Sequence, residues 1–321
     1  MNSLAMTLEA PKAATRDFRF SGHETFPCRY TWLPKAVTHL QADSGLFSDE
    51  DSAMVRLGVG KNMVRAIRFW ADAAGVAVTN TTGCMEVTLI GKEIFGSHGH
   101  DPFLEDIQTL WLLHWLLSSS QDEPLFAWNY LLNFWHRPDF TRSEALQVFV
   151  REAQRLGKKL SPVTLENHFT TFLHTYLPTR GAKGEILEDN LDCPLTELNF
   201  VLKAGDRTTG ESGRREPIYA FRVEDKPEIS PDLFAFCLND FWQKRRTTES
   251  TLSFRDVAVG ESSPGQVFKL PESAVRRRLE TIERDSAGAF IYQESSALPQ
   301  IVRHHKPSPI ALLARVYQKS K

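Results

Sequence analysis

The chain has 321 residues, four cysteines and a formal net charge of −2. An apolar share of 41% and a charged share of 24% are typical of a globular protein, and the length suits roughly two or three domains. The near-neutral charge excludes a wholly basic nucleic-acid coat, so any nucleic-acid binding must come from local patches. Cys28, Cys84, Cys193 and Cys237 form no CxxC pair, which argues against a zinc ribbon or redox pair and favours a reducing cytoplasm.

No segment predicts export or membrane insertion. Residues 1–16 lack the apolar core of a signal peptide and are expected to form a flexible tail. The longest apolar run, near Leu110–Leu117, contains His114 and is too short to span a bilayer. We therefore expect a cytoplasmic protein that does not bind membranes.

The first aromatic-rich stretch, Phe18–Leu40, contains the run SGHETFPCRYTWLPK. Within it, His23 is a candidate general base or metal ligand, Glu24 a candidate metal ligand and Arg29 a candidate phosphate-binding group. The alternative is that His23 and Glu24 cap or hydrogen-bond the start of the domain, because adjacent His-Glu pairs are common by chance. The chain contains no PD…ExK, HNH or GIY-YIG nuclease motif.

Residues 61–74 predict a short amphipathic helix with one basic and one apolar face. At about 100° per residue, Lys61, Arg65 and Arg68 share a face, with Asn62 at its edge. The opposite face carries apolar residues, namely Met63, Ile67, Trp70 and Ala74. No acidic residue interrupts residues 54–70, so this face suits a phosphate backbone. The alternative is a solvated basic face on an ordinary helix.

The segments on either side of this helix predict a winged helix. Before it, the glycine-containing turn Leu57–Gly60 follows a short apolar segment, Ala53–Leu57, as in a helix-turn-helix motif. After it, Gly75 is a helix stop. Two strand-like runs follow, Val76–Val78 and Met85–Ile90, with a polar turn at residues 80–83.

We therefore predict a DNA-binding winged helix within residues 17–100. Lys61, Asn62, Arg65 and Arg68 would contact DNA, and Arg56 on the preceding helix would clamp its backbone. A winged helix used only for protein contacts is the alternative. A phosphate-binding P-loop is rejected, because the GxGK run at residues 58–61 lacks its spacing and its serine or threonine.

The middle of the chain, residues 101–200, predicts a helical domain. Asp101 is expected to cap a helix that has Pro102 at its first position and runs to about Leu117. Three further helices are expected at 125–134, 143–156 and 164–176. The large aromatic residues of this region are most simply core, with a cofactor- or base-stacking role as the alternative; they are Trp111, Trp115, Phe126, Trp128, Phe134 and Trp135.

Residues 201–230 predict a loop or hairpin insertion. The stretch 203–217, KAGDRTTGESGRREP, is rich in glycine, threonine and charge and almost free of apolar residues. Arg207, Arg214 and Arg215 are candidate DNA contacts in this segment, and a solvated loop is the alternative.

The last part, residues 231–321, repeats the order of the first domain. A helix near 232–243, an apolar segment at 254–257 and a turn at Gly260–Gly265 lead to a basic helix, ESAVRRRLETIE. A hairpin near 289–302 would complete a second winged helix. Its arginines, Arg276, Arg277 and Arg278, fan around the helix, so this unit is a weaker DNA reader and serves DNA contact, packing or dimerisation.

The candidate metal sites are weakly patterned, and the metal itself stays unknown. His98, His100 and Asp101 offer two imidazoles and a carboxylate, although Asp101 is also the expected helix cap. The acidic cluster Glu188, Asp189 and Asp192 suits Mg²⁺, with a solvated loop as the alternative. His168 and His174 are not spaced to share a helix face, and His304-His305-Lys306 reads as an exposed basic turn.

SGHETFPCRYTWLPK followed by VRLGVGKNMVRAIRFWADAAG resembles the N-terminal motifs of the SspB-like family, bacterial proteins encoded with DNA phosphorothioation and phage-defence genes. LDCPLTELNFV at 191–201 and GQVFKLPESAV at 265–275 resemble later segments, so the likeness covers most of the chain. The resemblance implies a DNA-nicking role. Phosphodiester cleavage usually needs a divalent metal, so Mg²⁺ or Mn²⁺ is the expected cofactor. The resemblance also implies a cysteine desulfurase, an ATP-pyrophosphatase-like sulfur transferase and an ATPase as partners.

The sequence thus predicts a mainly α, α+β protein that binds double-stranded DNA and nicks one strand in a phosphorothioation and phage-defence system. A non-catalytic winged-helix regulator or scaffold that recruits the sulfur-transfer enzymes is the alternative, since no catalytic motif is recognisable. The oligomeric state is open, with a homodimer among the options.

Overall fold

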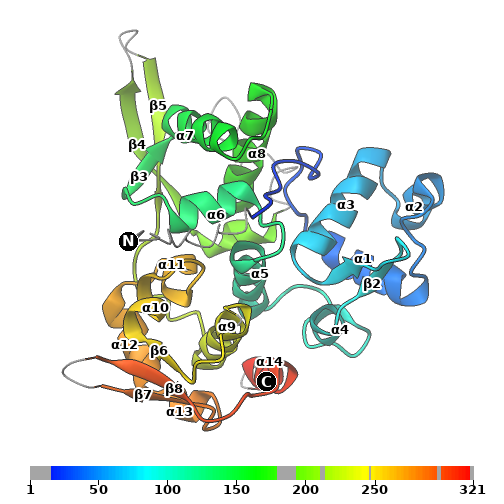
Figure 1. Cartoon of the computed structure of the whole chain (residues 1–321). Helices are drawn as coiled ribbons and strands as arrows, with labels where there is room; N and C mark the ends of the chain where they lie inside the picture. Colours follow the sequence, from blue (N-terminus) through cyan, green and yellow to red (C-terminus); the bar gives the residue numbers. More distant parts are fainter. Residues whose placement is uncertain (1–15, 179–192, 210–213, 246, 295–297, 319–321) are drawn as a thin grey trace, which may run out of the picture.

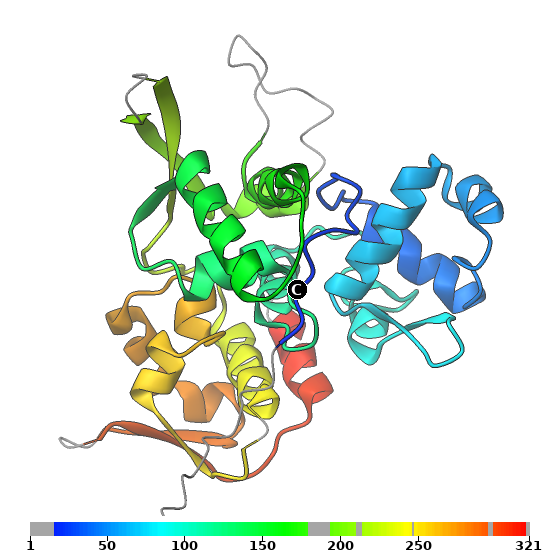
Figure 2. The ribbon, with the colours of Figure 1, turned by 45° about the horizontal axis from the view of Figure 1, so that its top comes forward.

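The computed structural model describes residues 16–178, 193–209, 214–245, 247–294 and 298–318. It is a mixed structure of helices and small antiparallel sheets, as the mainly α, α+β expectation requires. The N-terminal unit lies beside the helical middle, and the C-terminal unit packs below that middle in the view of Figure 1. Figure 2 shows the same separation from a second direction. In the described part of the chain no helix is long and apolar enough to cross a membrane.

The N-terminal unit contains helix, turn, helix and hairpin in the predicted order. Its elements are α1 (Trp32–Ala42), α2 (Glu50–Leu57), α3 (Lys61–Ala73), β1 (Ala77–Thr79), β2 (Met85–Val87) and α4 (Leu89–Phe95). The hairpin is antiparallel, with Ala77 opposite Val87. Its second strand is shorter than expected, because Thr88 accepts a hydrogen bond from the Gly91 amide and caps α4.

The middle is helical, as predicted, and its elements are α5 (Ile107–Ser119), α6 (Phe126–Asn133), β3 (Asp139–Thr141), α7 (Arg142–Arg155), α8 (Pro162–Tyr176) and the 3₁₀ helix η2 (Pro194–Leu198). The prediction that Asp101 caps the first helix is wrong. α5 begins at Ile107 and is capped by Asp106, whereas Asp101 accepts hydrogen bonds from the Glu105 and Asp106 amides in the loop before it. Residues 102–106, which the sequence pattern predicts as the start of this helix, therefore belong to the loop.

The predicted insertion is a hairpin that projects from the body (Figure 1). Its strands are β4 (Val201–Thr209) and β5 (Arg214–Phe221), and β5 also pairs with β3, giving the order β3-β5-β4. The register shifts between Lys203 and Gly205, where a bulge bends the outer strand.

The C-terminal unit contains α9 (Pro231–Lys244), β6 (Thr251–Ser253), α10 (Phe254–Val259), α11 (Pro264–Val267), α12 (Glu272–Glu280), α13 (Ile282–Asp285), β7 (Phe290–Gln293), β8 (Gln300–Arg303) and α14 (Pro309–Gln318). The sheet order is β6-β8-β7. The run ESAVRRRLETIE is two helices, because the chain leaves helical geometry at Thr281, with φ −105° and ψ 1°.

Buried apolar side chains from Phe20 to Tyr317 form one contiguous cluster. Trp111, Trp115 and Trp128 are fully buried in it, which confirms their predicted core role. Phe134 is the exception, because 42% of its surface is exposed. Burial of this apolar surface, aliphatic and aromatic, is the dominant favourable contribution to folding.

We expect Gly91→Ala to destabilise the N-terminal unit by about 2 to 3 kcal/mol. A Cβ at Gly91 would lie 2.1 Å from the Val76 carbonyl oxygen, and neither backbone can yield without moving α4 off the hairpin. Leu89→Ala, on the same helix but 68% exposed, is the control and should change stability little. Urea unfolding of both variants measures the difference, and equal midpoints would contradict this packing.

Candidate nucleic-acid interface

A tight turn sets the angle between α2 and α3. Gly58 ends α2 in the left-handed region, with φ 65°, and its amide donates to the Met54 carbonyl. Gly60 then precedes α3 in an extended conformation. Because a side chain at position 58 would be strained in that region, the glycine allows α2 and α3 to be joined by only three residues.

α3 is amphipathic as its sequence predicts. Val64, Ile67 and Trp70 are buried, whereas Lys61, Asn62, Arg65 and Arg68 are exposed; Met63 is half-buried. The Trp70 indole nitrogen donates to the Phe26 carbonyl over 3.0 Å, which fixes α3 against the SGHETFPC segment. The basic side chains therefore lie on the exposed face of a helix whose opposite face is packed in the core.

Two of the basic side chains on α3 are paired with one acid from α2. Glu50 lies 2.8 Å from Lys61 Nζ, and its carboxylate receives Arg65 Nε at 2.6 Å and Nη2 at 3.2 Å. These hydrogen bonds, first from Arg65 and then from Lys61, lower the pKa of Glu50 to about 2. The face is therefore not purely basic: a carboxylate from the preceding helix lies between two of its cations.

Arg68 is the exposed cation on this face with no acidic partner within salt-bridge distance among the residues that the structure describes. Arg56, by contrast, pairs with Asp43 at 2.6 Å. Asn62 is exposed at the start of α3. The structure thus places all five predicted DNA-contacting residues on the neighbouring helices α2 and α3. Three of the four cations among them are paired with an acid.

The SGHETF loop packs between α3 and α8. Gly22 has φ 108°, and a Cβ there would lie 2.7 Å from the Phe69 ring of α3. Glu24 and Thr25 are both left-handed, with φ 50° and 64°. Such backbone costs free energy for residues with a side chain, so surrounding contacts must hold the loop.

His23 supplies those contacts. It is 3% exposed, and its Nε2 lies 3.2 Å from Nδ1 of the fully buried His168 on α8. The Ala127 amide donates to His168 Nε2, so the neutral His168 ring carries its proton on the nitrogen that faces His23. His23 Nδ1 lies 3.1 Å from the Thr25 amide and 3.2 Å from the Thr171 hydroxyl.

Burial keeps this histidine pair neutral. It lowers the pKa of His23 to about 4, and it lowers the pKa of His168 well below its usual range. A base that is buried and so weakly basic is poorly matched to proton transfer near neutral pH. The geometry favours the hydrogen-bonding alternative for His23, a signal that no sequence pattern provides, because His168 is remote in the chain.

The other two candidate catalytic residues occupy different surroundings. Glu24 is half-buried, and after Glu50 its charge contributes to raising the pKa of Arg65. Arg29 lies over the rings of Trp32 and Phe26, at 5.5 Å and 5.8 Å from their centroids. A small pocket of about 170 Å³ is lined by His23 and Glu24, whereas Arg29 is not part of its lining.

The predicted metal-binding groups are not assembled in the described part of the chain. There, no three His, Cys, Asp or Glu side chains are placed to hold a metal ion. His100 stacks on Tyr317 at 4.8 Å, and Asp101 is occupied by backbone amides. Glu188, Asp189 and Asp192 lie outside the described residues.

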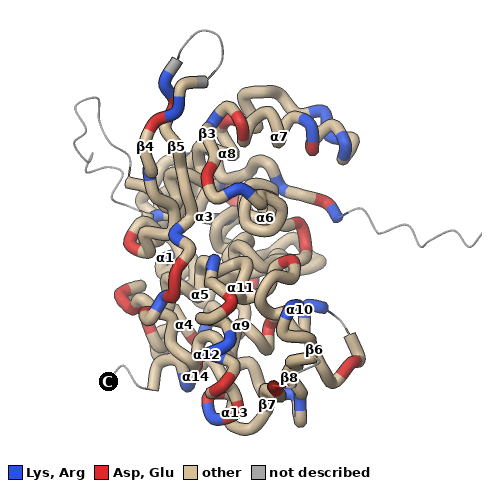
Figure 3. Tube along the Cα trace, turned by 90° about the vertical axis from the view of Figure 1, so that its left-hand side faces the viewer, with Lys and Arg blue, Asp and Glu red and all other residues tan. Residues whose placement is uncertain are grey.

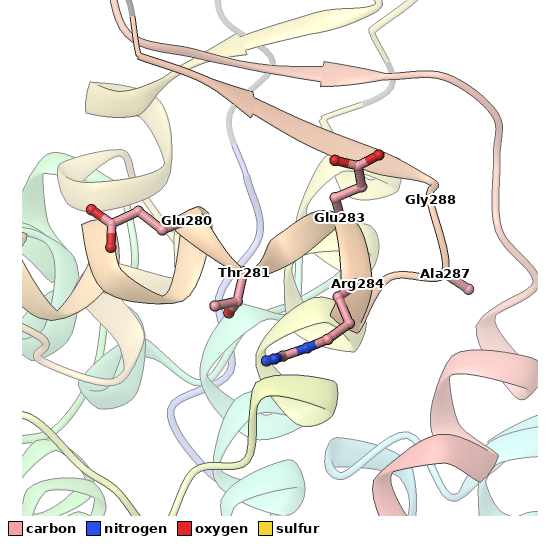
Figure 4. A pocket seen from close by; sticks show the side chains of 6 residues that line it. All are labelled: Glu280, Thr281, Glu283, Arg284, Ala287 and Gly288. Atoms are coloured by element: carbon pink, nitrogen blue, oxygen red, sulfur yellow. The ribbon is translucent and has the colours of Figure 1, made fainter.

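The C-terminal basic helix is neutralised. Arg276 contacts Glu294 at 2.5 Å, while Arg277 and Arg278 pair with Asp225 at 2.9 Å and 2.8 Å. Beside this helix is a hollow of about 610 Å³, where Figure 4 shows the side chains of Glu283 and Arg284 pointing apart. These side chains do not converge on a common point, so the hollow offers no assembled site.

The arginines of the projecting hairpin, which are candidate DNA contacts, are also only partly free of acidic partners. Arg207 pairs with Asp139 at 2.8 Å and Glu144 at 3.1 Å, whereas Arg215 is exposed on β5. The side chain of Arg214 lies outside what the structure describes. Figure 3 shows charges of both signs along this hairpin.

A family model described as "Protein of unknown function (DUF4007)" matches residues 20–317. Two SspB crystal structures, one of them magnesium-ion-bound, share the fold, with TM-scores of 0.79 and, for the magnesium-bound one, 0.77. Both are 24% identical to the chain; the matches cover 95% of it and 89–90% of the SspB chains. A search of curated proteins finds no match. The resemblance to SspB seen in the motifs is thus confirmed at the level of the fold.

We expect the free energy of unfolding to fall as the pH drops from 6.5 toward 5. The unfolded chain takes up protons near the ordinary histidine pKa of 6.5, whereas His23 stays neutral in the folded protein down to about pH 4. Because the unfolded state then binds more protons, each such histidine costs up to about 1.4 kcal/mol per pH unit.

His23→Asn should flatten this dependence by up to one histidine's share, as measured by urea unfolding at several pH values. His305→Asn is the control, because His305 is exposed beyond β8. An unchanged slope in His23→Asn would show that His23 is not held neutral.

Proposed function

Because the chain belongs to the DUF4007 family and has the fold of SspB, we propose that it is a DNA-binding protein of a phosphorothioation system that nicks one strand of duplex DNA. The observation that carries the DNA-binding part is the exposed basic face of α3, whose opposite face is buried and on which Arg68 has no acidic partner among the described residues.

The physical argument is electrostatic. Duplex DNA is a dense line of phosphates, and arginine and lysine side chains that replace its counterions bind with strong salt dependence. The short turn at Gly58–Gly60 sets α3 after α2 in the order found in helix-turn-helix proteins, whose second helix enters the major groove. Asn62 is then suited to a base edge, and Arg56 to a phosphate.

Glu50 lowers the net positive charge of the basic face of α3. Its pairs with Lys61 and Arg65 are half-exposed, with 34% of the Glu50 side chain and 45–53% of its partners' side chains accessible. Solvent screens exposed pairs of this kind, so they contribute little to stability. Phosphates can therefore displace Glu50, but the carboxylate weakens binding to DNA and makes Arg68 the strongest single contributor.

The nicking part of the proposal rests on the likeness to SspB. Glu24 is the best-placed candidate for the chemistry, because it is accessible on a loop that packs against α3 and lies near Arg65. An SspB structure contains magnesium, so Mg²⁺ and Mn²⁺ are the ions to test. A cysteine desulfurase, a sulfur transferase and an ATPase are the proposed partners.

One observation favours a second function, that of a non-catalytic regulator or scaffold that recruits the sulfur-transfer enzymes. His23, the residue best suited by type to act as a general base, is buried and bonded to His168. In that case the SGHETF loop only positions α3.

Arg68→Ala should weaken binding to a duplex and reduce the slope of log affinity against log salt by about one. Glu50→Gln should act in the opposite direction, because it releases Lys61 and Arg65 for phosphate contacts. Fluorescence anisotropy of a labelled duplex at several salt concentrations measures both. Arg255→Ala is the matched control, since Arg255 is exposed on α10, away from this face. Equal losses for Arg68→Ala and Arg255→Ala would contradict a specific interface.

Purified protein should convert supercoiled plasmid to open circles in the presence of Mg²⁺ or Mn²⁺. Glu24→Gln should abolish nicking while leaving duplex affinity within about twofold, because a carboxamide keeps the side-chain shape but loses its charge. Glu105→Gln, an exposed carboxylate elsewhere, is the control. Nicking that survives in Glu24→Gln removes this residue from the chemistry. If the wild-type protein binds but does not nick, the scaffold function stands instead.

A further inference from the structure

A cleft of about 630 Å³ lies between α6, α7 and the first described residues of the chain. It is called the α6–α7 cleft here, and its lining includes Phe18, Asn129, Tyr130, Phe134, His136 and Arg155. This volume falls in the range of small-molecule sites, roughly 300 to 1,000 Å³. None of the residues predicted to bind DNA or to act in catalysis belongs to its lining.

One wall of the cleft is an aromatic ladder on α6. Phe126, Tyr130 and Phe134 follow each other at helical spacing, with ring centroids 5.6 Å and then 5.9 Å apart. The ladder runs from the core to the surface: Phe126 is 2% exposed, Tyr130 is half-buried and Phe134 is 42% exposed. Large rings exposed in this graded way provide a stacking surface for another flat ring.

A buried polar group accompanies the ladder. Asn129 lines the cleft and is 2% exposed, and its side-chain amide nitrogen has no hydrogen-bond partner among the described residues. Leaving a buried amide without a partner is costly, so this nitrogen needs a partner that enters the cleft, such as a water or a ligand. A carboxamide can both donate and accept, which matches the mixed edge of a nucleobase.

The rim of the cleft carries charges of both signs. Arg155 pairs with Glu152 at 2.6 Å, and Arg16 pairs with Glu261 at 2.5 Å and with the Gln121 amide oxygen at 2.6 Å. Positive charge also gathers at the end of α7, as Figure 3 shows. Since the two rim arginines are balanced by acids, a ligand gains most from stacking and hydrogen bonding rather than from charge.

We infer that the α6–α7 cleft binds an unstacked nucleobase of a single-stranded or opened DNA segment. The base would stack on Tyr130 and Phe134, and its polar edge would meet Asn129. The inference rests on the proposed DNA-binding function, to which it adds a second contact of different chemistry. Stacking accepts any base, so the site should bind without strong sequence preference.

The experiment uses the full chain and a short single-stranded oligothymidine that carries one 2-aminopurine. Stacking should quench the fluorescence of that base on binding, with an affinity that depends weakly on salt. Phe134→Ala should weaken binding about tenfold and remove the quenching. Phe103→Ala, which removes a ring that is 74% exposed elsewhere, is the matched control and should leave both unchanged.

Two further variants separate this site from α3 and from a folding defect. Tyr130→Phe keeps the ring and should retain quenching, whereas Asn129→Ala should weaken binding with an unchanged urea midpoint. Arg68→Ala should impair duplex binding but not quenching of the single strand. If Arg68→Ala has no effect while Phe134→Ala does, the proposed α3 interface fails and the cleft stands.

The inference is overturned if Phe134→Ala binds and quenches like the wild type. It is also overturned if a tryptophan-containing peptide occupies the cleft, as seen by loss of peptide binding in Phe134→Ala, while the oligonucleotide does not bind.

Discussion

The contact between His23 and His168 is the constraint on which the rest of the structure depends. It joins the N-terminal loop to α8 and, through the Ala127 amide, to α6. Both rings are removed from water, so both are neutral, and the contact gives each buried ring a polar neighbour at 3.2 Å. The strained backbone at Glu24 and Thr25 is held by this contact.

The same contact sets the relation between the two surfaces proposed to meet DNA. α3 is tied to the SGHETF loop by Trp70 and Phe69, and α6 is tied to it through His168. A duplex on α3 and an opened base in the α6–α7 cleft would therefore be held at a fixed separation. A fixed separation of this kind suits a protein that holds the duplex at one surface and an opened base of one DNA strand at the other.

Charge distribution distinguishes the two units that look alike in sequence. In the C-terminal unit, Arg276, Arg277 and Arg278 are all paired with acids brought from other elements. On α3 of the N-terminal unit, Lys61 and Arg65 share Glu50, whereas Arg68 has no acidic partner within salt-bridge distance among the described residues. Two units with the same order of helices and strands therefore need not both bind DNA, because DNA binding depends on which charges the fold leaves exposed and unpaired.

The sequence by itself determined the local features of this protein. The helix at Lys61, its apolar back, the turn at Gly58 and the following hairpin are all set by short-range periodicity and glycine geometry. The same periodicity predicts the helical middle but not the start of α5, because Asp101 accepts the Glu105 and Asp106 amides in a loop and Asp106 caps the helix. The motifs also identified the family, since they span contiguous residues.

Only the tertiary structure decided how those features are used. Glu50 meets Lys61 and Arg65 because α2 crosses α3, and His23 meets His168 because distant helices pack together. Phe134 belongs to an aromatic run that predicts core, yet it faces a cleft. Burial, pairing and pKa depend on neighbours that are remote in the chain, and a pattern read along one segment contains no information about them.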